Sequence, residues 1–118
     1  MGITDVTITV KNPRYPKKTY TGAFVVDSGA LYTVVPATVL KKLGIKPDRE
    51  EEFFLADGKV IKRKLGSAFY EYKGKQGAAP VIFGEKDDYQ LLGVVTLEAL
   101  GLNLDPLKRT LYKPLLRM

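Results

Sequence analysis

The sequence contains no cysteine and no histidine among its 118 residues. Their absence excludes cysteine nucleophiles, Ser-His-Asp triads, disulfide bonds and nearly all zinc sites. Any catalytic chemistry must therefore come from carboxylates, lysine, tyrosine, hydroxyl groups or the backbone. We expect neither a bound metal nor a cofactor.

Long apolar runs are also missing. No stretch approaches the roughly 18 apolar residues that a membrane-spanning helix requires. Residues 1–5 lack the basic start and apolar segment of a signal peptide. We therefore expect a cytoplasmic protein without membrane contact. With 45% apolar and 27% charged residues, the chain fits a single globular domain over residues 1–118.

The net charge is +6, and the basic residues are dispersed. Aromatic residues do not interleave with them as a base-stacking platform requires. We therefore expect a solvated basic surface and no nucleic-acid partner. A nucleic-acid-binding β-barrel remains an open alternative, and its candidate contacts are Tyr15, Tyr20, Phe53, Phe54 and Tyr70.

Alternating and β-branched segments predict a mainly β fold. Residues 19–26 become fully apolar just before Asp27, as in a strand that enters a core. The Asp57-Gly58 pair separates two β-prone runs and predicts a hairpin, because glycine accepts a positive φ. The strands that we expect cover residues 3–10, 19–26, 50–55, 59–65, 67–72, 78–83 and 109–113.

Two short helices are expected among these strands, over residues 36–43 and 96–100. Pro36 suits the first position of a helix. Gly44 and Gly101 suit the left-handed position that follows a helix end. The sequence thus predicts a small, mainly β domain with two short helices.

Asp27 is the candidate catalytic residue, within Asp27-Ser28-Gly29-Ala30. It follows five uncharged residues, and a carboxylate at the end of a buried strand is costly without compensation. A purely structural alternative is that Asp27 caps the Ser28-Gly29 turn, as aspartate commonly does. The tripeptide alone does not decide between the two roles.

The wider context resembles the retropepsin-like (retroviral-type) aspartic proteases and indicates a cellular or prokaryotic member. The Asp27 segment, followed by Thr33-Val34-Val35-Pro36, resembles the active-site segment of that family. Leu91-Leu92-Gly93 and the helix after it resemble the segment that packs behind the catalytic loop. Asp57-Gly58 lies where the family has its flap hairpin. The resemblance extends from Val6 to Leu104 and implies a small closed or partly open β-barrel.

The resemblance implies an aspartic endopeptidase that acts as a homodimer. Such enzymes need two carboxylates that share one proton across a water molecule. The chain has one Asp-Ser/Thr-Gly motif, so the second carboxylate must come from a two-fold related copy. By resemblance, Asp27 activates the water while its copy protonates the substrate carbonyl, and the pair titrates as a unit.

Further roles follow from the same resemblance. The Ser28 hydroxyl hydrogen-bonds across the two-fold axis, and Gly29 and Ala30 complete the active-site loop. Ala56, Asp57 and Gly58 form a flap that closes over an extended peptide or unfolded-protein substrate. Alternatively, this is an ordinary exposed hairpin.

Some residues depart from the viral pattern. An aspartate and an arginine that often pair in viral members are replaced by Leu31 or Tyr32 and by Val94. Tyr32 and Val94 are our candidates for subsite lining. The tail, with Leu111, Tyr112, Leu115 and Leu116, is expected at the dimer interface or as a strand on the domain's own sheet. The alternative function is a non-catalytic peptide-binding or dimerisation module.

Overall fold

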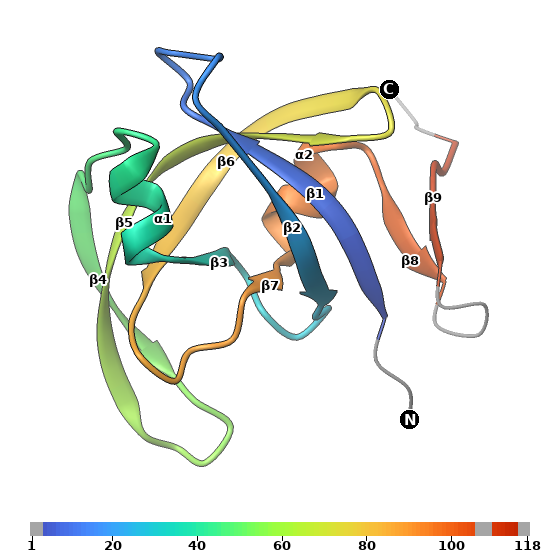
Figure 1. The fold of residues 1–118 in the computed structure, drawn as a ribbon. Helices are drawn as coiled ribbons and strands as arrows, with labels where there is room; N and C mark the ends of the chain where they lie inside the picture. The colour runs from blue at the N-terminus through green and yellow to red at the C-terminus, as the bar shows by residue number, and fades with distance from the viewer. Residues whose placement is uncertain (1–3, 106–109, 116–118) are drawn as a thin grey trace.

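The computed structural model describes residues 4–105 and 110–115 of the chain. These residues form a mainly β structure with two short helices, which confirms the predicted class (Figure 1). The elements are β1 (Asp5–Lys11), β2 (Thr19–Val26), β3 (Thr33–Pro36), α1 (Ala37–Lys42), β4 (Arg49–Phe54), β5 (Val60–Tyr72), β6 (Lys75–Gly84), β7 (Leu91–Leu92), α2 (Val94–Ala99), β8 (Asn103–Asp105) and β9 (Thr110–Tyr112).

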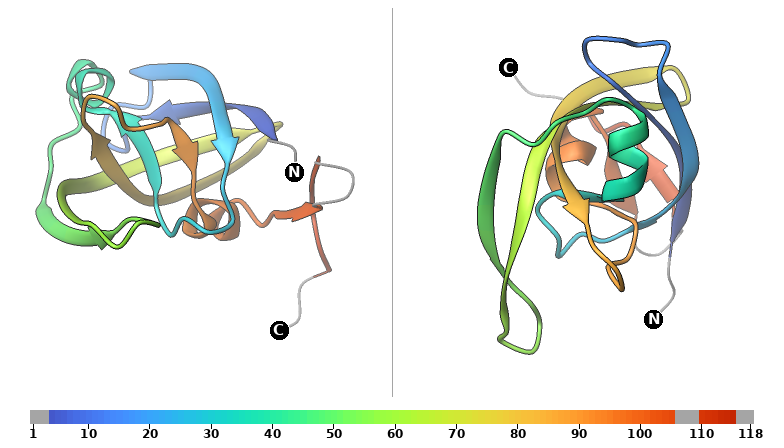
Figure 2. Two further views of the ribbon diagram at one scale, coloured as in Figure 1. Left: turned by 90° about the horizontal axis from the view of Figure 1, so that it is seen from below. Right: turned by 60° about the vertical axis from the view of Figure 1, so that its left-hand side comes forward.

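Seven of the strands belong to one sheet, in the order β1-β2-β7-β3-β6-β5-β4. Strand β1 also pairs with β5, so the pairings from β1 to β5 close into a ring. Strand β4 continues outward from β5 as one arm of a long hairpin. The β2–β7 and β3–β6 pairs are parallel. Strands β8 and β9 form a separate two-stranded sheet beside the ring (Figure 2).

A single core cluster joins the strands and both helices. The strands contribute alternate residues, as a period of two requires: β1 buries Ile8 and Val10, and β2 buries Phe24. Helix α1 buries Leu40 and α2 buries Leu97. No helix in residues 4–105 and 110–115 is long and apolar enough to cross a membrane.

The predicted strand over residues 19–26 and the hairpin around Asp57-Gly58 are confirmed. The two strands expected at 59–65 and 67–72 are wrong as separate elements, because β5 continues without a break through Gly66. A Cβ at this glycine would lie 2.8 Å from the carbonyl oxygen of Lys46. Gly66 therefore permits a close crossing of the chain and does not end the strand.

The helix predictions are confirmed with shifted bounds. Pro36 precedes α1 as its N-cap and is not its first residue. Helix α2 begins at Val94, two residues before the predicted start. Gly44 and Gly101 have φ values of +76° and +70°, the left-handed conformation predicted for both.

The tail forms a strand, but this strand does not belong to the main sheet. Strand β9 pairs antiparallel with β8, with Leu111 opposite Leu104. Tyr112 and Leu115 are exposed in this chain. The predicted contribution of Leu116 lies outside the described residues.

Candidate active site

Asp27 stands at the exit of β2 from the core. Val25 and Val26 pair with Leu91 and Leu92 of β7. The ladder continues one step further, because the Asp27 amide donates a hydrogen bond to the Leu92 carbonyl at 3.1 Å. The loop at 27–32 therefore starts from a fixed point on a parallel strand pair.

Backbone hydrogen bonds attach this loop to the start of α2. The Val94 amide donates to the Ala30 carbonyl at 2.9 Å, and the Val95 amide donates to the Leu31 carbonyl at 3.0 Å. Gly93 makes this approach possible, since a Cβ there would lie 2.5 Å from the backbone carbon of Tyr32. Segments about sixty residues apart in the sequence are thus in direct backbone contact.

Two buried threonines support the same contact. The Thr33 hydroxyl accepts a hydrogen bond from the Gly93 amide at 3.0 Å and shares another with the Thr96 hydroxyl at 2.6 Å. Burial raises the pKa of the neighbouring Tyr70, and hydrogen bonding with Thr96 and Thr33 opposes that rise. Sequence reasoning missed this network, because its only signal was a threonine inside each of two apolar segments.

The Asp27 side chain is exposed within one chain. The end of β2 is buried, as the sequence predicts, but the chain turns outward after Val26 and exposes Asp27 itself. One Asp27 carboxylate oxygen accepts a hydrogen bond from the Gly29 amide at 2.9 Å. This turn-capping bond fixes the carboxylate at the surface of the loop. Ser28 and Gly29 are exposed with it, and Ala30 is half-buried.

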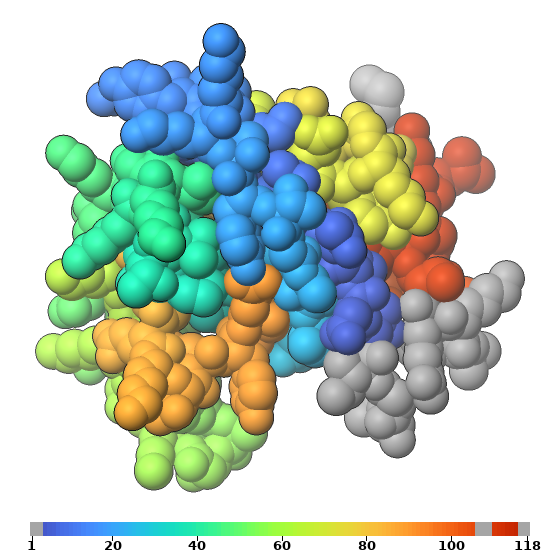
Figure 3. Space-filling view, in the orientation of Figure 1, coloured from blue at the N-terminus to red at the C-terminus, as the bar shows by residue number. Residues whose placement is uncertain are grey.

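The β4–β5 hairpin extends past the loop. At its tip, the Lys59 amide donates to the Asp57 carboxylate at 2.9 Å, and Gly58 has a φ of +86°. The tip residues Ala56, Asp57 and Gly58 are all exposed. Figure 3 shows the hairpin tip beside the segment that precedes β7, at the lower end of the molecule in that view.

A pocket of about 510 Å³ lies between the loop, the hairpin and the segment before β7. The aromatic ring of Tyr32 meets that of Phe53 edge-on, with centroids 6.3 Å apart. Tyr32, one of our candidates for subsite lining, thus lines this pocket. The lining residues are Gly29, Ala30, Leu31, Tyr32, Val34, Phe53, Phe54, Leu55, Ile61, Arg63, Ile82, Asp87, Asp88, Tyr89 and Leu91.

The predicted site residues divide between three places. Gly29 and Ala30 line this pocket. Ser28 and Val94 instead line a separate hollow of about 320 Å³, which also includes Tyr112 of β9. Ala56, Asp57 and Gly58 lie at the hairpin tip beyond the pocket, and the neighbouring residues Phe53, Phe54 and Leu55 form its wall.

An ion pair ties the hairpin to the segment before β7. The Arg63 guanidinium donates two hydrogen bonds to the Asp88 carboxylate, at 2.7 and 3.0 Å. The two side chains are only 14% and 23% exposed. The Arg63 hydrogen bonds lower the pKa of Asp88, and the Glu85 amide, 2.8 Å from the same carboxylate, lowers it further. Sequence reasoning did not find this pair, because 25 residues separate its members.

The aromatic residues considered for nucleic-acid contact do not form one surface. Tyr70 is fully buried, whereas Phe54 is 84% exposed at the hairpin and Tyr15 lies in the loop after β1. No group of three or more acidic side chains in the described ranges is placed to hold a metal ion.

No protein-family model matches the sequence, and no curated protein matches it.

Proposed function

We propose that the protein is a homodimeric aspartic endopeptidase of the retropepsin-like type. The observation that carries the proposal is the exposed Asp27 carboxylate on a loop latched by Gly93. A catalytic carboxylate needs a fixed position and access to substrate, and this loop provides both. The closed ring of strand pairings supports a small β-barrel of the retropepsin type.

The proposed chemistry requires two copies of Asp27. The ionised copy takes a proton from a water molecule, and the water oxygen attacks the carbonyl carbon of the peptide. The protonated copy gives its proton to the carbonyl oxygen, which yields a tetrahedral diol. As the diol collapses and the C–N bond breaks, the protonated carboxyl gives its proton to the amide nitrogen. The other carboxylate takes a proton from a diol hydroxyl as the C=O bond re-forms, so the pair again shares one proton.

The surface around Asp27 supports pairing of two chains. Ser28 beside it lines a hollow that continues to Leu104 and Tyr112 of the β8–β9 sheet. Leu104 and Leu111 of this sheet pack against the core of the same chain, whereas Tyr112 remains exposed. In the proposed dimer, a second copy related by two-fold symmetry would cover this hollow and place its own Asp27 opposite the first.

The pocket beside the loop supports a peptide substrate with an apolar side chain. Its walls are mainly aromatic and aliphatic, and its volume lies within the usual range for ligand pockets. The β4–β5 hairpin extends over this space as a flap would, where strand backbone can pair with an extended peptide.

Cleavage of a diverse peptide library from about pH 3 to 7.5 tests the proposal. We expect Asp27→Asn to lose at least about a hundredfold in kcat/KM, because it removes the base that activates water. The matched control is Asp48→Asn. The Asp48 carboxylate is exposed and lies 3.8 Å from the Arg49 guanidinium. We expect this variant to retain activity. Equal cleavage by wild type and Asp27→Asn would overturn the catalytic assignment.

A non-catalytic peptide-binding module is the second candidate function. The observation that favours it is that the pocket of about 510 Å³ is complete within one chain. This reading predicts that peptides bind to wild type and to Asp27→Asn equally, and that neither protein cleaves them. Peptide binding measured alongside the cleavage assay separates the two functions.

A further inference from the structure

A second pocket, of about 430 Å³, lies at the end of α1. Strands β5 and β6 separate it from the pocket beside Asp27. Successive side chains of a strand point to opposite faces, so Arg63 and Ile82 line the first pocket whereas Lys64 and Phe83 line the second. The two pockets share no lining residue.

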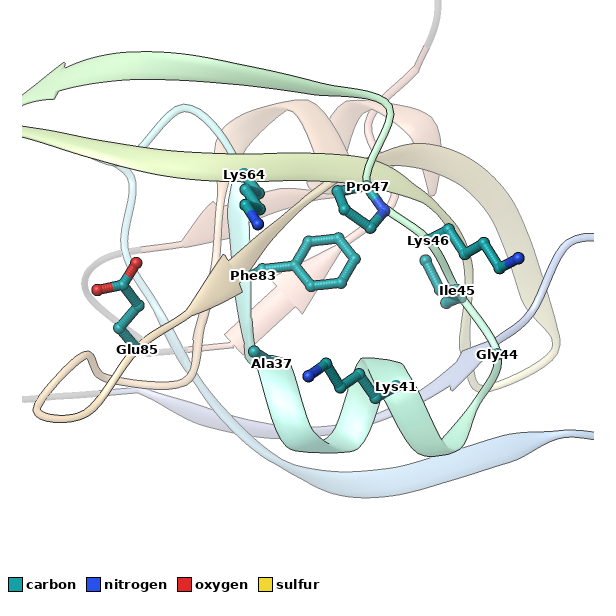
Figure 4. Close-up of a pocket in the computed structure, with 9 residues that line it drawn as sticks. All are labelled: Ala37, Lys41, Gly44, Ile45, Lys46, Pro47, Lys64, Phe83 and Glu85. Atoms are coloured by element: carbon teal, nitrogen blue, oxygen red, sulfur yellow. The ribbon is translucent and has the colours of Figure 1, made fainter.

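The second pocket has an apolar floor and a cationic rim (Figure 4). Phe83 and Ile45 on the floor are each only 6% exposed. In the view of Figure 4, Lys64 from β5 lies above the Phe83 ring and Lys41 from α1 lies below it. The rim therefore carries lysine side chains from two separate elements.

The backbone around the pocket is fixed. The connection after α1 is anchored by the Ile45 amide, which donates to the Leu40 carbonyl at 3.0 Å, and by the Asp48 amide, which donates to the Leu65 carbonyl at 2.8 Å. The Gly44 amide donates to the Lys41 carbonyl at 2.9 Å. These amides are already used, so a bound anion would be held by lysine side chains. Phosphate sites typically add a cradle of free backbone amides.

The lysine residues at this pocket form no ion pair within the part of the chain that the structure describes. In residues 4–105 and 110–115, no carboxylate lies within 4.0 Å of the ammonium groups of Lys41, Lys46 or Lys64. The acidic residue of the pocket, Glu85, is directed to Arg63 at 3.6 Å. The rim thus favours an anion electrostatically.

We propose that this pocket binds a carboxylate carried on an aromatic body. The ring packs on Phe83 and Ile45 while Lys41 and Lys64 bind the carboxylate. The volume lies within the usual range for small-ligand sites. A free aromatic acid and a peptide that ends in an aromatic residue share this chemistry. The proposal does not depend on the function of Asp27.

Amide chemical shifts of ¹⁵N-labelled protein test the proposal, with 3-phenylpropionate as the probe. We expect saturable shifts at residues 41–46 and 83–85. The neutral 3-phenylpropanamide, and the Lys41→Gln/Lys64→Gln variant with the acid, should each bind at least about tenfold more weakly, because the charge interaction is lost. The control Lys73→Gln/Lys113→Gln changes the net charge equally at exposed sites outside the pocket and should bind like wild type.

Equal binding of the acid and the neutral amide would overturn the proposal, as would equal weakening by the control variant. A hexapeptide with a C-terminal phenylalanine separates the two ligand sources. Tighter binding of the hexapeptide than of the acid identifies a peptide C-terminus, and the reverse order identifies a small molecule. Asp27→Asn should bind both probes like wild type.

Discussion

At the residue scale, the candidate active site depends on small side chains that allow close contact. Gly93 leaves room for the backbone of Tyr32, and the Thr33 hydroxyl accepts a hydrogen bond from the Gly93 amide. Together they connect the Asp27 loop to α2. The position of the loop therefore depends on uncharged residues that take no part in the proposed reaction.

Thr33→Val tests this support. Valine has nearly the same shape, but it removes the side-chain acceptor of the buried Gly93 amide and the hydrogen bond between Thr33 and Thr96. We expect the free energy of unfolding to fall by about 2–3 kcal/mol, with faster hydrogen exchange at the Gly93 amide. The control is Thr21→Val, which breaks an exposed bond with Thr9 and should change stability little. Equal losses from both variants would contradict the supporting role of Thr33.

At the element scale, the β4–β5 hairpin is a projecting arm that Arg63 anchors to the segment before β7. Arg63 lies on β5, and its partner Asp88 lies in that segment. Both residues line the pocket beside the loop. The pair therefore holds two walls of the pocket at a fixed separation.

The lowered pKa of Asp88 gives this anchor a pH dependence. A carboxyl with a lowered pKa stabilises the fold above its unfolded value, near pH 4, and loses that contribution as the pH falls through its folded value. At pH 7, we expect Asp88→Asn to lower the free energy of unfolding by about 1–2 kcal/mol. The difference from wild type should shrink as the pH falls below about 4 and Asp88 becomes protonated.

Urea unfolding at several pH values measures this difference. Asp57→Asn is the matched control, since Asp57 lies at the exposed hairpin tip and accepts a backbone hydrogen bond from Lys59. The free energy of unfolding of Asp57→Asn should equal that of wild type at every pH. A deficit for Asp88→Asn that stayed constant from pH 7 to 2 would show that the charge pair is not its cause.

At the scale of the whole molecule, one chain presents half of the proposed catalytic site. Asp27 is exposed, and the surface beside Ser28 continues onto the β8–β9 sheet. The proposed dimer brings two such halves together. Its assembly, and not a change within one chain, would complete the carboxylate pair.

A mixing experiment tests the shared site directly. Adding an equal amount of Asp27→Asn to wild type, with time for subunit exchange, should reduce the measured activity to about half, because only one dimer in about four is then fully wild type. Adding the active control Asp48→Asn should instead raise the activity. Unchanged activity after addition of Asp27→Asn would show that each chain acts alone.

The sequence by itself determined the mainly β class, the Asp57-Gly58 hairpin and the two glycine-terminated helices, because these follow from local periodicity and from backbone conformations that glycine favours. It also identified the Asp27 segment and its relation to Leu91-Leu92-Gly93. Only the tertiary structure decided the ring closure by β1 and β5, the exposure of Asp27, and the pairs Thr33–Thr96 and Arg63–Asp88. Each depends on residues far apart in the chain, whose contact is set by strand order and packing and not by any local pattern.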